Sequence, residues 1–151
     1  NSLLEAVVYA ARIADDISGR SFARAPALVT SQTRPNTAMP PLREANMRAM
    51  MSSHVGVIRN GDDLAEAIRT FAVIEQTTGN FALRNMATTA LIVATSAWAR
   101  CESRGAHFRA DYPAEDTAQR RRTMTTLNEA RHIAASLDHT PLKRTSAGAC
   151  P

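Results

Sequence analysis

The first helix that the pattern of apolar residues predicts runs from about Leu3 to Ser18 and stops at Gly19. Ser2 and Glu5 have the spacing of a capping box, in which each side chain accepts a hydrogen bond from the backbone amide of the other residue. The apolar side chains then recur every three to four residues and form one helix face: Leu4, Val7, Val8, Ala11, Ile13 and Ala14. We interpret this abrupt start, without an initiator methionine, as a cut, with the partner of this helix upstream of the sequence.

The segment 19–40 has no such period. It carries Pro26, Pro35 and Pro40, many serine and threonine residues and no acidic residue. Connections of this length without secondary structure are uncommon inside a compact domain. We therefore expect a linker that either crosses a missing domain or is disordered, and that separates the 1–18 helix from a C-terminal unit.

Three further helices are predicted in that unit, over about 41–59, 61–77 and 81–103, with short polar turns between them. Pro41 suits the first position of a helix, and Gly61 and Asn80 lie at the turns. The third of these helices has the strongest period, with Leu83, Met86, Ala87, Ala90, Leu91, Ala94, Ala97, Trp98 and Cys101 on one face. We expect Met86 and Trp98 to be buried between helices. The pattern predicts an all-α fold, an antiparallel three-helix bundle.

After this bundle the chain is irregular until a second capping box, Thr126 with Glu129, which precedes a short helix over about 127–137. The C-terminal helical-bundle domain is therefore expected over 41–138. The tail 139–151 shows no period and is expected to fray.

Composition refines this picture. The chain is 44% hydrophobic and 21% charged, which is globular, and only 5% aromatic, which suits packing between helices. The net charge of +4 is modest and argues only weakly for nucleic acid. The dense run Arg120–Arg122 is interpreted as a solvated helix end or loop. No apolar stretch is long enough to predict a membrane span.

Cys101 and Cys150 do not make a disulfide framework, because Cys101 falls on an apolar helix face and Cys150 is the next-to-last residue, so a reduced, cytoplasmic protein is expected. A nucleophilic pair of Cys101 with His107 is disfavoured, because Cys101 falls on the core face. Metal-ligand spacing is absent among the histidines, His54, His107, His132 and His139. His54 is interpreted as a satisfied core histidine, and Met47, Met50 and Met51 as core filling rather than a cofactor site.

Two places stand out chemically. The free backbone amides near Ser2 and Leu3, at the start of the first helix, favour an anion through the helix dipole. The second place is the loop Glu102–Pro113, ESRGAHFRADYP, which concentrates ion-pairing side chains around Gly105. For this loop we expect a docking or loop-ordering network rather than catalysis.

These same two places carry a family resemblance. NSLLEAVVYAARIA resembles the helix after the last flavin-contacting turn in the succinate dehydrogenase/fumarate reductase flavoprotein family, which includes the L-aspartate oxidases. ESRGAHFRADYP is similar to a loop in the C-terminal helical domain of that family. The Leu-Arg-Glu and Met-rich second helix is most similar to the L-aspartate oxidase branch. The chain departs from the succinate dehydrogenase pattern after Asp111-Tyr112-Pro113.

The resemblance implies a role in a larger flavoenzyme. It places Ser2 and Leu3 at the N1–C2=O edge of FAD, where a helix N-terminus stabilises the negative charge of reduced flavin. It implies oxidation of L-aspartate to iminoaspartate for NAD biosynthesis, with the FAD-binding and capping domains upstream of Asn1. It assigns no catalytic or metal-binding residue to this chain, so the chain alone is expected to be inactive and not to bind FAD.

Two alternatives stay open. The chain could be the same domain of a succinate dehydrogenase or fumarate reductase flavoprotein, which would have an iron–sulfur partner subunit. It could also be a free-standing basic helical module that binds protein or RNA. In isolation, the apolar face of the first helix is expected to be covered by a neighbouring copy, in a swapped or homodimeric contact.

Overall fold

The computed structural model describes the backbone of residues 2–21 and 37–138, and the chain separates into two compact units, 1–33 and 34–151. In the first unit the structure describes 2–21, of which α1 (Ser2–Ser18) is the helix; it ends at Ser18, just before Gly19, as the sequence predicts. Every described side chain of α1 is exposed, and its large apolar residues lie open to solvent: Leu3, Leu4, Val7, Val8, Tyr9, Ile13 and Ile17.

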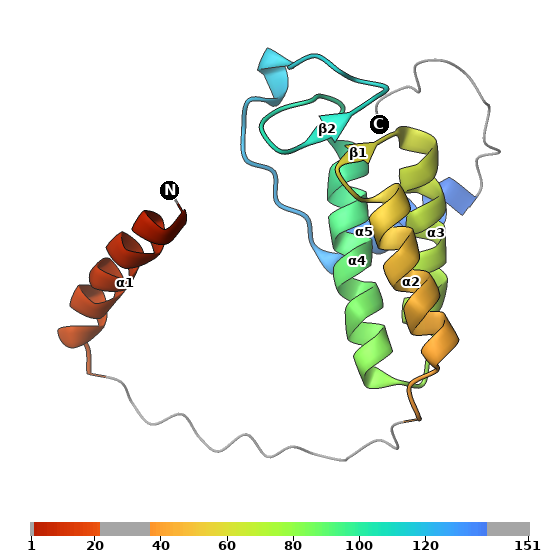
Figure 1. Cartoon of the computed structure of the whole chain (residues 1–151), viewed down its shortest axis with the longest axis horizontal. Helices are drawn as coiled ribbons and strands as arrows, with labels where there is room; N and C mark the ends of the chain where they lie inside the picture. Colours follow the sequence, from red (N-terminus) through yellow and green to blue (C-terminus); the bar gives the residue numbers. More distant parts are fainter. Residues whose placement is uncertain (1, 22–36, 139–151) are drawn as a thin grey trace. The chain divides into compact units, whose positions relative to one another are not determined.

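The second unit is mostly helical, which confirms the predicted fold class. It contains α2 (Pro41–His54), α3 (Gly61–Thr77), α4 (Phe81–Ala99) and α5 (Leu127–Asp138). Figure 1 shows α2 and α4 running in one direction and α3 in the other, with α5 behind them. A three-residue 3₁₀ turn, η1 (Thr117–Gln119), lies in the connection between α4 and α5.

Residues at the N-termini of these helices determine where each helix begins. Pro41 starts α2, Asn60 Oδ1 accepts from the Asp63 amide at the start of α3, and Asn80 Oδ1 accepts from the Leu83 amide at the start of α4. The Thr126–Glu129 capping box is confirmed. The Thr126 amide donates to Glu129 Oε2 at 2.7 Å, and the Glu129 amide donates to Thr126 Oγ1 at 3.3 Å.

The core lies mainly between α3 and α4, and α5 closes one side of it. Its fully buried residues include Leu64, Ile68, Phe71, Leu83 and Leu91, and α5 adds Ala130, Ala134 and Leu137. The prediction that Met86 and Trp98 are buried is wrong in extent, because both are only partly buried at the edge of the core. Thr95, which the apolar pattern omitted, is fully buried because its hydroxyl donates to the Leu91 carbonyl at 2.6 Å.

Two predicted boundaries are wrong. The helix expected to reach Arg59 ends at His54, and the chain then forms β1 (Ile58–Arg59). The helix expected to reach Ser103 ends at Ala99, and the following loop contains β2 (Phe108–Arg109). β1 and β2 pair in parallel, with Ile58 opposite Phe108 and Arg59 opposite Arg109. This small sheet joins the α2–α3 connection to the loop after α4 at one end of the bundle (Figure 1).

The last residues of the predicted linker belong to the bundle. Thr37 accepts a hydrogen bond through its carbonyl from Asn80 Nδ2 at 2.6 Å, and Met39 packs against the core. The middle of the linker, 22–36, and the tail 139–151 lie outside the described residues, so the expectations of disorder and fraying remain predictions.

Candidate functional site

The predicted site at the start of α1 is described only in part. Leu3 is 83% exposed, and Asn1 and the side chain of Ser2 lie outside the description. The Ser2–Glu5 capping box and the contact of Ser2 and Leu3 with a cofactor therefore remain predictions. The backbone of α1 begins at Ser2, one residue before the start near Leu3 that the sequence pattern predicts.

The predicted network in the loop Glu102–Pro113 is present, and Glu102 is its centre. This carboxylate is fully buried. Arg104 Nη2 donates to its Oε2 at 2.9 Å, the Asp116 amide donates to the same oxygen at 2.9 Å, and Arg100 Nη1 pairs with Oε1. A buried charge is tolerable only when it is paired and hydrogen-bonded in this way.

These partners decide the ionisation of Glu102. The hydrogen bond from Arg104 is the largest influence, and with the Asp116 amide and Arg100 it outweighs burial, so the pKa of Glu102 falls to about 2. In return, the pKa of Arg104 is raised by its hydrogen bond to Glu102. Arg104 also reaches Glu115 at 2.9 Å and the Asp116 carbonyl at 3.1 Å, so the network extends to the residues just before η1.

Arg100 extends this network to the segment before α5. It donates to the carbonyls of Gln119 and Arg121 at 3.0 and 2.8 Å, while the Cys101 amide donates to Gln119 Oε1 at 3.1 Å. The connection from η1 toward α5 is thereby fixed to the end of α4.

Arg109 and Asp111 form a second centre, which we name the Arg109–Asp111 clamp. Arg109 is only 2% exposed and donates from Nε and Nη2 to both carboxylate oxygens of Asp111, at 2.8 and 2.7 Å. Its Nη1 donates to the carbonyls of Ala97 and Trp98 in the last turn of α4, and Asp111 accepts from the Gly61 amide at the start of α3. A cation thus lies at the negative end of α4 and an anion at the positive end of α3.

The ionisation of Asp111 follows from this geometry. Burial acts to raise the pKa of Asp111, but the hydrogen bonds and charge of Arg109 and the amide of Gly61 outweigh it, and the pKa is lowered. The guanidinium also lies 5.1 Å from the centre of the Tyr112 ring. The clamp therefore connects the end of α4, which Arg109 contacts, to the start of α3, which Asp111 contacts, through one ion pair.

His107 connects β1 to the end of α4. Its Nε2 lies 3.1 Å from the Arg100 carbonyl and its Nδ1 lies 3.0 Å from Arg59 Nη1, a pairing that fits a neutral ring protonated at Nε2. Burial is the largest cause that lowers the pKa of His107, and the charges of Arg59, Arg109 and Arg100 act in the same direction. The Arg104–His107 turn depends on Gly105, whose φ of 59° is in the left-handed region.

The hydrogen bonds and ion pairs described above order the loop Glu102–Pro113. The ring nitrogens of His107 are both engaged, and Cys101 is buried and disulfide-bonded, so the two do not form a nucleophilic pair. The prediction of unpaired cysteines is therefore wrong for Cys101, and it no longer supports a cytoplasmic location. Cys150 lies outside the described residues.

The remaining candidate residues take ordinary positions. The Arg120–Arg122 run is largely exposed, as predicted. His54 is half-buried, with Ser53 Oγ 2.6 Å from its Nδ1 and Glu66 3.8 Å from its Nε2, so it lies at the edge of the bundle and not in the core. Within 2–21 and 37–138, three or more metal-ligating side chains never gather at one place, and no helix is long and apolar enough to cross a membrane.

One ion pair was missed by the sequence reasoning. Glu75, on the core side of α3, is 5% exposed and accepts from Arg131 of α5 at 2.5 Å. The hydrogen bond that Arg131 donates to Glu75 raises the pKa of Arg131. The sequence indicated this contact only through the position of Glu75, a single acidic residue among the apolar residues on the core face of α3.

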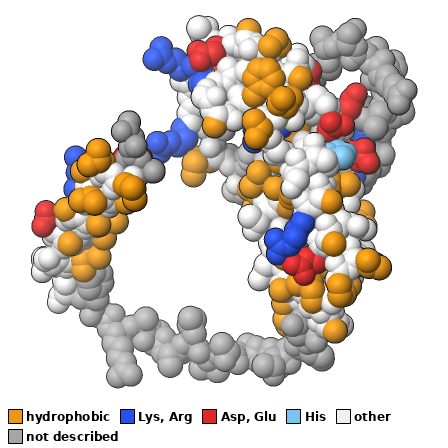
Figure 2. All heavy atoms as spheres, viewed as in Figure 1, with side chains coloured by type: hydrophobic (Ala, Val, Ile, Leu, Met, Phe, Trp, Pro, Cys, Tyr) orange, Lys and Arg blue, Asp and Glu red, His pale blue; other side chains and the backbone are white. Residues whose placement is uncertain are grey.

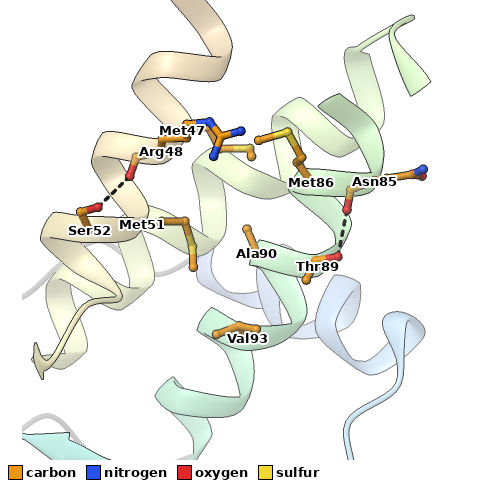
Figure 3. A pocket seen from close by; sticks show the side chains of 9 residues that line it. All are labelled: Met47, Arg48, Met51, Ser52, Asn85, Met86, Thr89, Ala90 and Val93. Carbon is orange, nitrogen blue, oxygen red and sulfur yellow. Dashed lines mark hydrogen bonds between the residues drawn. The ribbon is translucent and has the colours of Figure 1, made fainter. Parts of the chain in front are cut away.

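A groove of about 580 Å³ runs between α2 and α4 and is mainly apolar. Figure 3 shows Met51, Met86, Ala90 and Val93 around it, with Met47 and Arg48 at one end. The hydroxyls of Ser52 and Thr89 donate to carbonyls of their own helices, at 3.2 and 3.0 Å. Met47 is buried as core filling, as predicted, while Met50 and Met51 are only partly buried.

Comparison with known proteins gives the chain relatives. Residues 76–148 match the family described as fumarate reductase flavoprotein C-terminus. The chain is 46% identical over 125 residues to an L-aspartate oxidase of Rhodospirillum rubrum, covering 81% of this chain and 45% of that protein. It is 36% identical over 125 residues to an L-aspartate oxidase of Agrobacterium fabrum, covering 83% of this chain and 24% of that protein.

A third relative, an L-aspartate oxidase of Streptomyces coelicolor, is 31% identical over 166 residues, covering 93% of this chain and 29% of that protein. The chain thus spans less than half the length of each of these relatives. No solved structure matches the chain.

Proposed function

Because the chain belongs to the L-aspartate oxidase family of flavoproteins, we propose that it is the C-terminal helical part of an FAD-dependent L-aspartate oxidase. The observation that carries this proposal is the similarity to several such oxidases over about four-fifths of the chain. The complete enzyme would oxidise L-aspartate to iminoaspartate for NAD biosynthesis. This chain would serve it as an accessory, docking domain, with the FAD-binding and capping domains upstream.

The open face of α1 fits contact with a flavin domain. Leu3 and Leu4 are 83% and 69% exposed, and the described residues of the first unit leave the start of this helix uncovered. We propose that the backbone amides of Ser2 and Leu3 donate toward the N1–C2=O edge of FAD. When bound, FAD supplies the site that accepts hydride from the substrate. The helix N-terminus would stabilise the negative charge that develops there.

These residues can supply only one edge of a cofactor site. A flavin is held mainly through its adenosine and pyrophosphate in a dinucleotide-binding fold, which has a Gly-rich turn before a helix. The sequence contains no such turn. We therefore propose no catalytic residue in this chain and expect the 151-residue chain alone to show neither FAD affinity nor aspartate oxidation.

The test compares the 151-residue chain with the complete gene product. We expect one FAD per complete polypeptide and oxidation of L-aspartate with oxygen or fumarate as the electron acceptor. The isolated chain should show neither. Succinate oxidation together with a co-purifying iron–sulfur subunit would favour the succinate dehydrogenase alternative. Stoichiometric FAD binding by the isolated chain would overturn the proposal.

Substitution at Ser2 tests the helix start directly. Ser2→Pro removes the backbone amide, whereas the matched control Ser2→Ala removes the hydroxyl and keeps the amide. In the complete enzyme we expect Ser2→Pro to lower the flavin reduction potential and slow aspartate oxidation, with FAD largely retained. Ser2→Ala should change the potential less. A potential unchanged by Ser2→Pro would remove the proposed role of this amide.

A further inference from the structure

In the segment 106–111, exposed apolar residues alternate with buried or partly buried polar residues. This is the reverse of the pattern in an ordinary strand with one face in water. Its apolar residues Ala106, Phe108 and Ala110 are exposed. The polar residues between them point inward: Arg109 is buried, and His107 and Asp111 are partly buried. A strand with one face in water normally has its apolar side chains toward the core and its polar ones outward. The outward face of this segment is therefore apolar, which is unusual for a strand face that is exposed to water.

β1 enlarges this face. Ile58 is directly opposite Phe108 in the parallel ladder and is 68% exposed, and the preceding Val57 is 80% exposed. We name this surface the β1–β2 patch; it consists of Val57, Ile58, Ala106, Phe108 and Ala110. Figure 2 shows hydrophobic side chains gathered over the end of the bundle where Figure 1 places β2.

The patch is held rigidly from its inner side. The Ala110 amide donates to the Arg59 carbonyl at 2.7 Å, and Arg59 contacts His107. Arg109, the residue after Phe108, is anchored by the Arg109–Asp111 clamp. A surface fixed in this way loses little conformational entropy when a partner covers it.

We propose that the β1–β2 patch is a docking surface for a part of the same polypeptide outside these 151 residues. This inference rests on the proposed function, since it takes the chain as one part of a longer flavoprotein. The relatives are long enough to supply such a part, because the chain spans only 45% and 24% of the first two.

The small size of the patch favours a tethered partner over a second copy of the chain. A stable interface between separate proteins buries about 800 Å² on each partner, which five side chains, two of them alanines, do not provide. A covalently connected domain needs less area, because the connection supplies a high effective concentration. The partner surface is expected to be apolar and to exclude water from Ile58 and Phe108.

Hydroxyl-radical footprinting tests the inference, with Phe108 as the probe and the highly exposed Met124 as the internal reference. We compare the 151-residue chain with the complete gene product, after far-UV circular dichroism has verified the helical fold of both. We expect a severalfold loss of Phe108 labelling, relative to Met124, in the complete product. FAD content and aspartate oxidation are measured on the same sample.

A matched pair of variants provides the second arm. Ile58→Lys lies in the patch, and Val73→Lys changes another exposed β-branched residue on α3. In the complete product, Ile58→Lys should restore Phe108 labelling toward the level of the isolated chain, and Val73→Lys should not. Neither change should lower the helix content of the isolated chain.

The outcomes separate the two proposals. Equal Phe108 labelling in both proteins, with aspartate oxidation intact, would overturn the docking inference and leave the proposed function standing. Labelling of the isolated chain that falls with protein concentration would identify a second copy as the occupant and would also overturn it. A complete product without FAD or aspartate oxidation would overturn the proposed function itself.

Discussion

The loop after α4 and the helix α1 order their side chains in opposite ways. In the loop, polar groups are buried, and some of their partners are distant in sequence; Gly61 and Asp111, for example, are 50 residues apart. In α1, the described polar contacts are local, such as Ser18 with the Ala14 carbonyl, and the large apolar side chains are exposed. The contacts that order the loop are therefore present in this chain, whereas the described residues leave the apolar face of α1 exposed.

The largest effect is expected at the clamp. Arg109→Met leaves the carboxylate of Asp111 and the last carbonyls of α4 without their cation, which should cost about 3–5 kcal/mol of unfolding free energy. Urea unfolding of the isolated chain, followed by circular dichroism, measures it. The matched control Arg122→Met, at an exposed position, should change stability by about 0.5 kcal/mol or less. Equal losses for the two variants would mean that the clamp does not stabilise the bundle.

The same chemical change at two leucines sharpens the comparison. Leu91 is fully buried in α4, so Leu91→Ala should cost about 2–5 kcal/mol. Leu4 is 69% exposed on α1, so Leu4→Ala should cost about 0.5 kcal/mol or less in this chain. Thermal unfolding of both variants provides the measurement. A comparable loss at Leu4 would mean that α1 is covered in solution, by the bundle or by a second copy.

A smaller, pH-dependent effect is expected at Glu102. The pKa of Glu102 is about 2 in the folded chain and near 4.5 as an ordinary glutamate, so the unfolded chain binds the proton more readily. Its contribution to stability is thus complete above about pH 4.5 and is lost as the pH falls toward 2. Melting temperatures measured from about pH 7 to about pH 2.5 should therefore fall less steeply for Glu102→Gln than for the unaltered chain. Parallel curves would show that Glu102 does not contribute to acid sensitivity.

The sequence predicts best what is local. Pro41 and the Thr126–Glu129 capping box act within one helical turn, and the structure has both helix starts where the sequence pattern predicts them. The charge density of Glu102–Pro113 also predicted a network. The sequence could not say which groups pair, because Asp111 reaches Gly61 only after α3 and α4 have packed.

What the sequence missed depends on tertiary contacts. β1 and β2 are two residues each, too short for a period-2 pattern, and they pair in parallel across the loops at one end of the bundle. Glu75 is buried because Arg131 comes from a different helix to meet it. The helix predicted to Ser103 stops at Ala99, where Arg109 binds the carbonyls of its last turn.

The clamp also has a consequence for the order of events in folding. α3 and α4 are joined by a short turn, so their pairing closes a short loop and can form early. The contacts of Asp111 with Gly61 close a much longer loop and require both helix ends to be in place. The clamp is therefore expected to form after the transition state. Arg109→Met should then accelerate unfolding and leave the refolding rate nearly unchanged. The clamp would therefore determine the unfolding rate, and with it the lifetime of the folded state, rather than the folding rate.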